Sequence, residues 1–218
     1  MKTFTLVIGN KNYSSWSLRG WLAARLAGID FTEDLVLLQA PDYRQTLLAH
    51  SPAAKVPVLK HGEQVIWDTL AIIETLAELR PAAGLWPEAS EVRAHARSIS
   101  AEMHAGFAAL RSHMPMNLRA SLPGKGRGPG VEADISRITE IFRDCRARFG
   151  QDGPFLFGPF SAADAMYAPV IARFRTYAVP LDPDCQAYAD AILAWPAFTA
   201  WQTAALDEPW IVPEDEID

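Results

Sequence analysis

The chain has 218 residues, of which half are hydrophobic and 21% are charged, so it has the composition of a globular protein with one large domain or two small ones. A formal net charge of −6 argues against nucleic acid as a partner, because nucleic-acid binding usually needs a basic face. No apolar run approaches the roughly 18 residues that span a bilayer, so we expect no membrane partner.

The cysteines and histidines point to a protein of the reduced cytoplasm without a metal. Cys145 and Cys185 lie far apart and form no CxxC pair, so we expect no structural disulfide. The five histidines show no ligand spacing with cysteine or acidic residues. The first residues predict a strand rather than a signal peptide, because a short apolar stretch turns polar without a small-residue cleavage site.

The first eighty residues alternate short strand-like and helix-like segments. Predicted strands are residues 3–8, 31–37, 56–59 and 64–67. Predicted helices are residues 15–27, 42–49 and 69–79. Gly28 suits a helix C-cap, and His61-Gly62 suits a tight hairpin between the last two strands. The order βαβ, short helix, ββα predicts a small mixed sheet with helices packed on it.

The rest of the chain is predicted to be helical. Residues 80–90 contain two prolines and a glycine and predict a linker, so we expect domains over residues 1–79 and 91–218. Predicted helices are residues 91–113, 132–149, 161–177, 184–194 and 197–206. Pro115 should kink or end the first of these helices.

The first feature that could carry chemistry is the hydroxyl-rich segment between the first strand and the first helix. Tyr13, Ser14 and Ser15 lie there. A hydroxyl at a helix start is usually a cap for free backbone N–H groups. The functional alternative is that it donates a hydrogen bond to a thiolate. Lowering a thiol pKa of about 8.5 by two units needs about 2.7 kcal/mol. A charge-assisted hydrogen bond supplies about 1.5–3 kcal/mol and the helix end about 0.5–1 kcal/mol more, so no charged base is required.

The second feature is the proline at the start of the third predicted strand. From spacing alone we expect an ordinary trans bond between Val56 and Pro57. If that bond were cis, the Val56 N–H and C=O groups would face solvent and could pair with an extended peptide as an added strand does.

The third feature is Asp68-Thr69, where the fourth predicted strand meets a helix. Capping is the simpler explanation for both residues. The same geometry suits an anion, because free N–H groups and a hydroxyl can bind a carboxylate. Asp68 could meet an α-amino group beside it, so a ligand with a carboxylate next to an ammonium fits this corner.

The order and spacing of the three features resemble the N-terminal domain of glutathione transferases, especially the serine-type classes. Ser-Ser-x-Ser-x-Arg at residues 14–19 is similar to the opening motif of the zeta class. Residues 52–59 resemble the cis-proline segment of the family, and residues 68–72 resemble its γ-glutamyl-binding turn. Residues 157–164 resemble the N-capping box before the buried sixth helix of the family.

This resemblance implies the glutathione transferase fold, with an α/β thioredoxin-like N-terminal domain and an all-α C-terminal domain. It implies glutathione as cosubstrate, no metal, and a homodimer. Ser14 would hold the thiolate as the catalytic residue, with Ser15 as second choice and Tyr13 as third. The implied glutathione-binding residues are Ser14, Ser15, Lys55, Val56, Pro57, Asp68 and Thr69. Of these, Lys55 would reach the glycyl carboxylate, while Val56 would pair with the cysteinyl backbone.

In this family the second substrate lies between the domains, against the first helix of the helical half. Methionine and aromatic residues at helical spacing are more often core than pocket. A helix that ends near Pro115 would nevertheless leave several of them beside a cleft, where thioethers suit a permissive apolar pocket. The expected pocket residues are Met103, His104, Phe107, Arg111, Met114, Met116 and Asn117. Arg111 could attract an anion or form a surface salt bridge.

The expected function is a transferase that activates the glutathione thiol for attack on a small apolar electrophile. One alternative is a glutathione-dependent isomerase of the maleylacetoacetate isomerase type. This chain departs from the zeta pattern there, because it has Trp16 where zeta enzymes usually carry a cysteine. The other alternative is a non-catalytic glutathione-binding or interaction module, since capping alone explains two of the three features.

Overall fold

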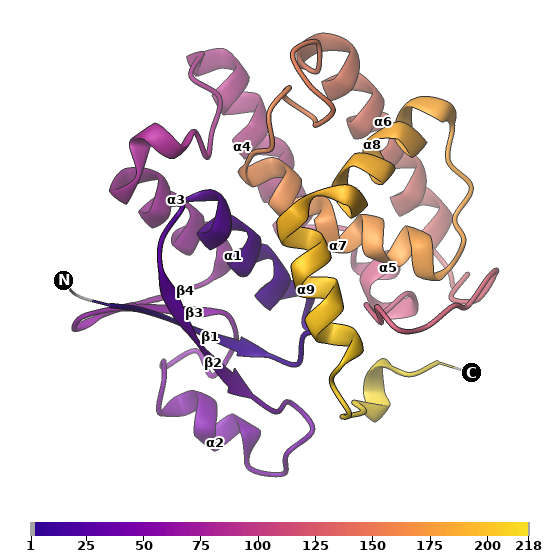
Figure 1. Ribbon diagram of the computed structural model, residues 1–218. Coiled ribbons are helices and arrows are strands. Elements are labelled where there is room, and N and C mark those ends of the chain that lie inside the picture. The colour runs from indigo at the N-terminus through magenta and orange to yellow at the C-terminus, as the bar shows by residue number, and fades with distance from the viewer. Residues whose placement is uncertain (1–2, 218) are drawn as a thin grey trace.

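The computed structural model describes residues 3–217 and begins with a four-stranded sheet (Figure 1). The strands are β1 (Phe4–Gly9), β2 (Phe31–Val36), β3 (Val58–His61) and β4 (Gln64–Trp67). Their order in the sheet is β2-β1-β3-β4. β1 is parallel to β2 and antiparallel to β3, and β3 and β4 form a hairpin. The sheet is therefore mixed, as the βαβ-ββα order predicts.

Three helices cover the sheet on its two faces. They are α1 (Ser15–Leu26), α2 (Tyr43–Leu48) and α3 (Thr69–Leu79). α1 packs against α3 on one face, and α2 lies alone on the other (Figure 1). Both faces of the sheet are buried at β1, because successive side chains of this strand point to opposite faces. Leu6 and Ile8 join the main core, while Val7 packs with Leu47 of α2 in a smaller cluster.

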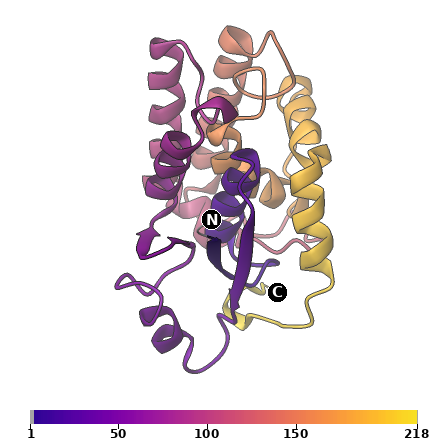
Figure 2. The ribbon, with the colours of Figure 1, turned by 60° about the vertical axis from the view of Figure 1, so that its left-hand side comes forward.

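The chain from residue 90 onward folds into helices around a buried one. The helices are α4 (Ser90–Ala105), α5 (Ala108–His113), α6 (Val131–Phe149), α7 (Ala162–Thr176), α8 (Pro183–Ala194) and α9 (Pro196–Leu206). Short 3₁₀ turns lie at Pro81–Ala83 and Pro213–Asp215. α7 contacts α1, α4 and α8, so one hydrophobic core runs from the sheet into the helices. Figure 2 shows α1, in indigo, between the magenta helices and the yellow α9. None of the helices within residues 3–217 is long and apolar enough to cross a membrane.

Two predicted elements differ from the structure. The helix expected over residues 91–113 is broken at Gly106 and Phe107, where Phe107 takes a left-handed φ of 55°. Glycine weakens a helix by about 1 kcal/mol relative to alanine, which makes this position a natural breaking point. The third strand begins at Val58 rather than Val56. Pro57 has no N–H to donate to the sheet, so pairing begins after it.

The predicted N-capping box of α7 is present and fully buried. The Asp164 Oδ2 atom accepts hydrogen bonds from the Ser161 amide at 2.8 Å and from the Ser161 hydroxyl at 2.7 Å. Its Oδ1 atom accepts one from the Leu156 amide at 3.1 Å. Burial raises the pKa of Asp164 to about 6, against the opposing effect of these hydrogen bonds. The carboxylate thus ties the preceding loop to the start of the central helix, which is a structural role.

Candidate active site

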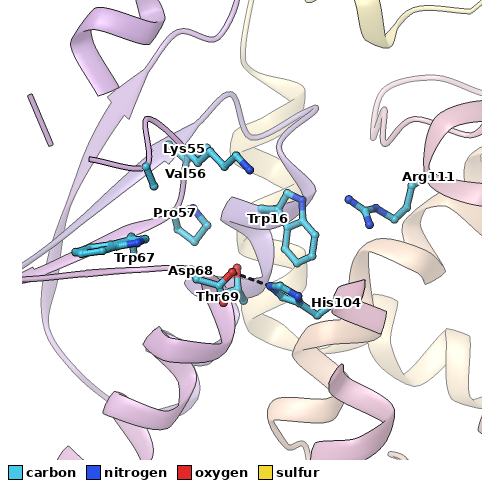
Figure 3. A pocket seen from close by; sticks show the side chains of 10 residues that line it. Trp16, Lys55, Val56, Pro57, Trp67, Asp68, Thr69, His104 and Arg111 are labelled. Atoms are coloured by element: carbon cyan, nitrogen blue, oxygen red, sulfur yellow. Dashed lines mark hydrogen bonds and ion pairs between the residues drawn. The ribbon is translucent and has the colours of Figure 1, made fainter. Parts of the chain in front are cut away.

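Two neighbouring cavities lie where the sheet meets the helical half of the chain. The first has a volume of about 440 Å³ and is lined by Trp16, Ala53, Lys55, Val56, Pro57, Trp67, Asp68, Thr69, His104 and Arg111 (Figure 3). The second has a volume of about 310 Å³ and is lined by Tyr13, Ser15, Trp16, Ala108, Arg111, Ser112, Pro115, Met116, Arg173 and Asp215. Trp16 and Arg111 line both cavities and so stand at the border between them.

One wall of the first cavity comes from the segment that leads into β3. Lys55, Val56 and Pro57 all line it. The Val56–Pro57 bond is cis, so the trans bond expected from spacing alone is wrong and the cis bond implied by the family resemblance is present. Val56 precedes the paired residues of β3, and its N–H and C=O groups make no backbone hydrogen bond within residues 3–217. These two groups remain available to an extended peptide.

The adjoining wall is the turn between β4 and α3 (Figure 3). Asp68 has a φ of 73°, a backbone conformation that residues other than glycine rarely adopt. Such strained residues are often found at functional sites. The Asp68 Oδ1 atom caps α3 by accepting from the Leu70 amide at 2.9 Å, and Oδ2 lies 2.7 Å from Nε2 of His104 (Figure 3). His104 belongs to α4, so this contact joins the two halves of the chain across the cavity.

Thr69 is the most informative residue of this turn. Its side chain is buried, yet its Oγ1 atom has no hydrogen-bond partner within the described residues. A buried hydroxyl without a partner costs about 1–3 kcal/mol. Because Thr69 lines the cavity at the first position of α3, a ligand carboxylate could satisfy both this hydroxyl and the free amides of the helix start.

The serines at the start of α1 have different surroundings. Ser14 is 8% exposed and lines neither cavity. Its hydroxyl donates to Ser17 Oγ at 2.7 Å and accepts from the Ser17 amide at 3.4 Å, so it caps the helix. Ser15 lines the second cavity, and its Oγ lies 3.4 Å from Nη2 of Arg173. The geometry therefore favours Ser15 over Ser14 as the hydroxyl that meets a ligand.

Tyr13 also lines the second cavity, but its hydroxyl is already engaged. It donates to Glu216 and accepts from Nη2 of Arg119 at 2.9 Å. Burial and the neighbouring Glu216 raise the pKa of Tyr13, with Arg119 acting in the opposite direction. A phenol with a raised pKa and two partners is poorly placed to take or share a thiol proton.

Arginines make this part of an acidic protein locally positive. The guanidinium of Arg19 lies 4.4 Å from the ring centre of Trp16, and that of Arg111 lies 5.1 Å from it. Arg173 is buried, and desolvation together with Arg111 lowers its pKa to about 10. Asp215, in the C-terminal 3₁₀ turn, lines the second cavity together with Arg173, and burial raises the pKa of Asp215 to about 6. This field favours an anion at the border between the cavities.

Comparison with known families identifies the fold. A model of the glutathione S-transferase N-terminal domain matches residues 13–79, and a model of the glutathione S-transferase C-terminal domain matches residues 128–204. The chain belongs to the glutathione S-transferase family. Its α/β half is therefore the thioredoxin-like domain of that family, and its helical half is the family's all-α domain.

Individual relatives agree with this assignment. A probable maleylacetoacetate isomerase from Caenorhabditis elegans is 38% identical over 98 residues, which cover 45% of each chain. Among solved structures, a glutathione transferase homologue from Burkholderia with bound glutathione has a TM-score of 0.71 and 22% identity, over 94% of this chain and 99% of that one. The holo structure of maleyl pyruvate isomerase, a bacterial zeta-class member, has a TM-score of 0.71 and 23% identity, over 94% and 98%. The chain spans about half to two thirds of the length of the curated relatives that it matches first.

The residues that were expected to line the pocket of the second substrate divide into two groups. His104, Arg111 and Met116 line the cavities. The remaining four, which do not line either cavity, are Met103, Phe107, Met114 and Asn117. The first three of these belong to the hydrophobic core. Asn117 instead accepts from Nδ2 of Asn12 at 2.9 Å and donates to Glu216, so it braces the fold.

Eight lining residues were missed by sequence reasoning, and four of these have aromatic or charged side chains: Trp16, Trp67, Arg173 and Asp215. Trp67 is 44% exposed and adjoins Asp68, and Trp16 adjoins Ser15, so both could have been found from their neighbours. Arg173 and Asp215 carry no such signal, because they are more than 150 positions away from Ser15 in the sequence. Only the packing of α7 and the C-terminal turn brings them to the site.

Proposed function

We propose that this protein is a glutathione-dependent transferase that binds the tripeptide in the first cavity and a small electrophile in the second. The observation that carries the proposal is the unpartnered buried hydroxyl of Thr69, a residue that lines the first cavity together with Val56, whose backbone N–H and C=O groups are free within the described residues. The solved Burkholderia homologue with the same fold has glutathione bound, which supports the choice of ligand.

The first cavity offers a partner for each part of glutathione. The γ-glutamyl carboxylate would accept from Thr69 Oγ1 and from amides of the first turn of α3. The neighbouring ammonium group would lie beside the Asp68 carboxylate, which has further lone pairs besides those used by Leu70 and His104. The cysteinyl backbone would pair with Val56, and Lys55 would reach the glycyl carboxylate.

The thiol would then lie at the border between the cavities, at the start of α1. There the Ser15 hydroxyl would donate to the sulfur, while Arg111 and Arg173 would favour its anionic form. The thiolate attacks the electrophilic carbon, a sulfur–carbon bond forms, and the leaving group departs with its electron pair. The thiol proton is released to solvent, so the serine need only position and stabilise the sulfur.

Binding and turnover can be tested separately. We expect the protein to bind immobilised glutathione and to conjugate chlorodinitrobenzene, with loss of turnover in Ser15→Ala. Epoxides, peroxides, other halogenated aromatics and maleylacetone would complete the panel. Binding of glutathione without turnover of any of these compounds would instead support a non-catalytic binding module.

Thr69→Val should weaken glutathione binding about tenfold, because it removes one hydrogen bond to a charged group, worth about 1.5 kcal/mol, while keeping the shape of the side chain. Isothermal titration calorimetry with glutathione measures the change in Kd. Thr75→Val on the same helix is a matched control, since the Thr75 hydroxyl is bonded to the Ala71 carbonyl and lines neither cavity. Equal affinities of the two variants for glutathione would mean that Thr69 does not bind the ligand.

The arginines also favour the isomerase alternative within the same site. Arg111 and Arg173 line the second cavity, which suits an electrophile that carries a carboxylate. Three of the proteins similar to this chain are named as isomerases of maleyl compounds. In that reaction the thiolate adds to one carbon of a double bond, the resulting single bond rotates, and elimination restores both the thiolate and the double bond.

Arg111→Leu should therefore lower kcat/KM about tenfold for maleylacetone, an anion, and by less than about threefold for neutral chlorodinitrobenzene. Steady-state kinetics with both substrates measures the ratio. Arg97→Leu serves as control, because Arg97 is an α4 arginine that pairs with Glu74 and lines neither cavity. An equal loss with both substrates would mean that Arg111 acts on the thiolate rather than on substrate charge.

We infer further that the chain works as a homodimer in a reducing cytoplasm, as its family resemblance implies. Both cysteines are free and buried in the structure, which is compatible with that environment. Light scattering coupled to size-exclusion chromatography would measure the mass, and a value near 24 kDa would show a monomer instead.

A further inference from the structure

A cluster of three possible metal ligands lies away from the two cavities, between α4 and α6. His95 comes from α4, and Asp144 and Cys145 are consecutive residues of α6. One donor atom from each lies within 4.8 Å of the other two. His95 and His104 are nine residues apart on α4, so the cluster is about 13 Å along the helix from the glutathione cavity. We propose that His95, Asp144 and Cys145 form a site for a zinc-like divalent cation.

The separations of the donor atoms fit a single ion. The His95 Nε2 atom lies 3.6 Å from Cys145 Sγ and 3.6 Å from Asp144 Oδ2. Ligands bound tetrahedrally to zinc at about 2.0–2.3 Å are themselves about 3.3–3.6 Å apart. The third separation, between the donor atoms of Cys145 and Asp144, is within 4.8 Å, so an ion between the three atoms would reach all of them after adjustment of the side chains.

The chemistry of the donors selects the class of metal. A thiolate, an imidazole and a carboxylate together suit zinc and related transition metals. Calcium and magnesium prefer shells made only of oxygen, which this cluster does not offer. The Cys145 thiol would lose its proton on coordination, so binding would release one proton to solvent.

Solvent has access to the proposed metal site. Cys145 is buried, but the His95 side chain is 28% exposed and that of Asp144 is 45% exposed, so solvent reaches the cluster from one side and could supply a fourth ligand. Asp144 also pairs with Arg148 at 2.8 Å. The Arg148 side chain is half exposed, and exchanging such a surface ion pair costs only about 0–1 kcal/mol. A bound ion would link α4 to α6 and so stabilise the helical half of the chain.

Cobalt substitution tests this site directly, because Co²⁺ bound to a thiolate absorbs in the near ultraviolet and tetrahedral Co²⁺ absorbs in the visible. We expect both signals when Co²⁺ is added to the reduced, glutathione-free protein, and their loss when Zn²⁺ is added. The chain has two cysteines, so Cys185→Ser is a matched control. Cys185 is also buried, and its thiol donates to the Thr139 carbonyl at 3.6 Å. Cys185→Ser should keep the thiolate band, and Cys145→Ser should abolish it.

A second variant and a second readout guard against misfolding of Cys145→Ser. His95→Gln should weaken Co²⁺ binding at least about tenfold while leaving both cysteines in place. Zn²⁺ should raise the melting temperature of the wild type and of Cys185→Ser, but not that of His95→Gln. Absence of a thiolate band in the wild type, or a band that survives loss of Cys145, would overturn the proposal without affecting the transferase assignment.

Discussion

Ser15→Ala should raise the pKa of the bound glutathione thiol by one to two units, which corresponds to a loss of about 1.4–2.7 kcal/mol of thiolate stabilisation. The physical reason is the loss of a charge-assisted hydrogen bond from the only one of the two serines that lines a cavity. The thiol pKa would rise from about 6.5 to about 7.5–8.5, so at pH 7 the thiolate fraction, and with it kcat/KM for chlorodinitrobenzene, should fall about three- to twenty-fivefold. Ultraviolet titration of the thiolate in the complex measures the shift.

Ser14→Ala is the informative control, because it removes the neighbouring hydroxyl, which the sequence resemblance ranks first. Its hydroxyl caps α1 through Ser17, so its loss should lower the free energy of unfolding by about 1 kcal/mol and leave the thiol pKa unchanged. A thiol pKa that moves in Ser14→Ala and stays in Ser15→Ala would return the catalytic role to Ser14. If the thiol pKa were unchanged in both variants, we would assign the stabilisation of the thiolate to Arg111 and Arg173 instead.

Asp164→Ala should be the most destabilising single change in the helical half, with a loss of about 3 kcal/mol in the free energy of unfolding. The carboxylate accepts from two amides and one hydroxyl, and truncation leaves these buried donors without a partner. For a chain of this length the melting temperature should fall by about 6–12 °C. Thermal unfolding followed by circular dichroism measures it. Asp190→Ala, an exposed aspartate of α8, should change stability by less than about 0.5 kcal/mol.

The same residue gives a pH dependence whose sign follows from its shifted pKa. Asp164 has a pKa of about 6 in the folded protein, while an unfolded aspartate titrates near 3.9. Between about pH 4 and 6 the folded state therefore binds more protons than the unfolded state, and stability falls as pH rises, by up to about 3 kcal/mol. Asp215 shifts in the same direction and adds to this slope. Asp164→Asn keeps the shape of the side chain and should reduce the slope. An unchanged slope in this variant would place the titrating group elsewhere.

Most secondary structure could be predicted because local rules decide it. The short apolar run of β1 and the hairpin turn between β3 and β4 follow from strand propensity and turn chemistry. The capping box of α7 follows from four consecutive residues, Ser161 to Asp164. The Asp68-Thr69 turn is local in the same way, so the start of α3 at these residues could be predicted from the sequence.

The orientation of individual side chains could not be predicted in the same way. Ser14 and Ser15 are neighbours in the sequence, but consecutive residues at the start of a helix point in directions about 100° apart, so one caps the helix and the other faces the cavity. Met103 and Met114 have the composition expected of a pocket, but both lie fully buried in the core. Such outcomes depend on what packs against each face.

By itself, the sequence determined the order of strands and helices, the caps that begin α3 and α7, and the family to which the chain belongs, because these depend on residues close together in the chain. Only the tertiary structure decided which serine lines a cavity, that Arg173 and Asp215 line the same cavity, and that His95 faces Cys145. These contacts form between segments 50 to 200 positions apart, and burial in one continuous core, rather than any local pattern, brings them together.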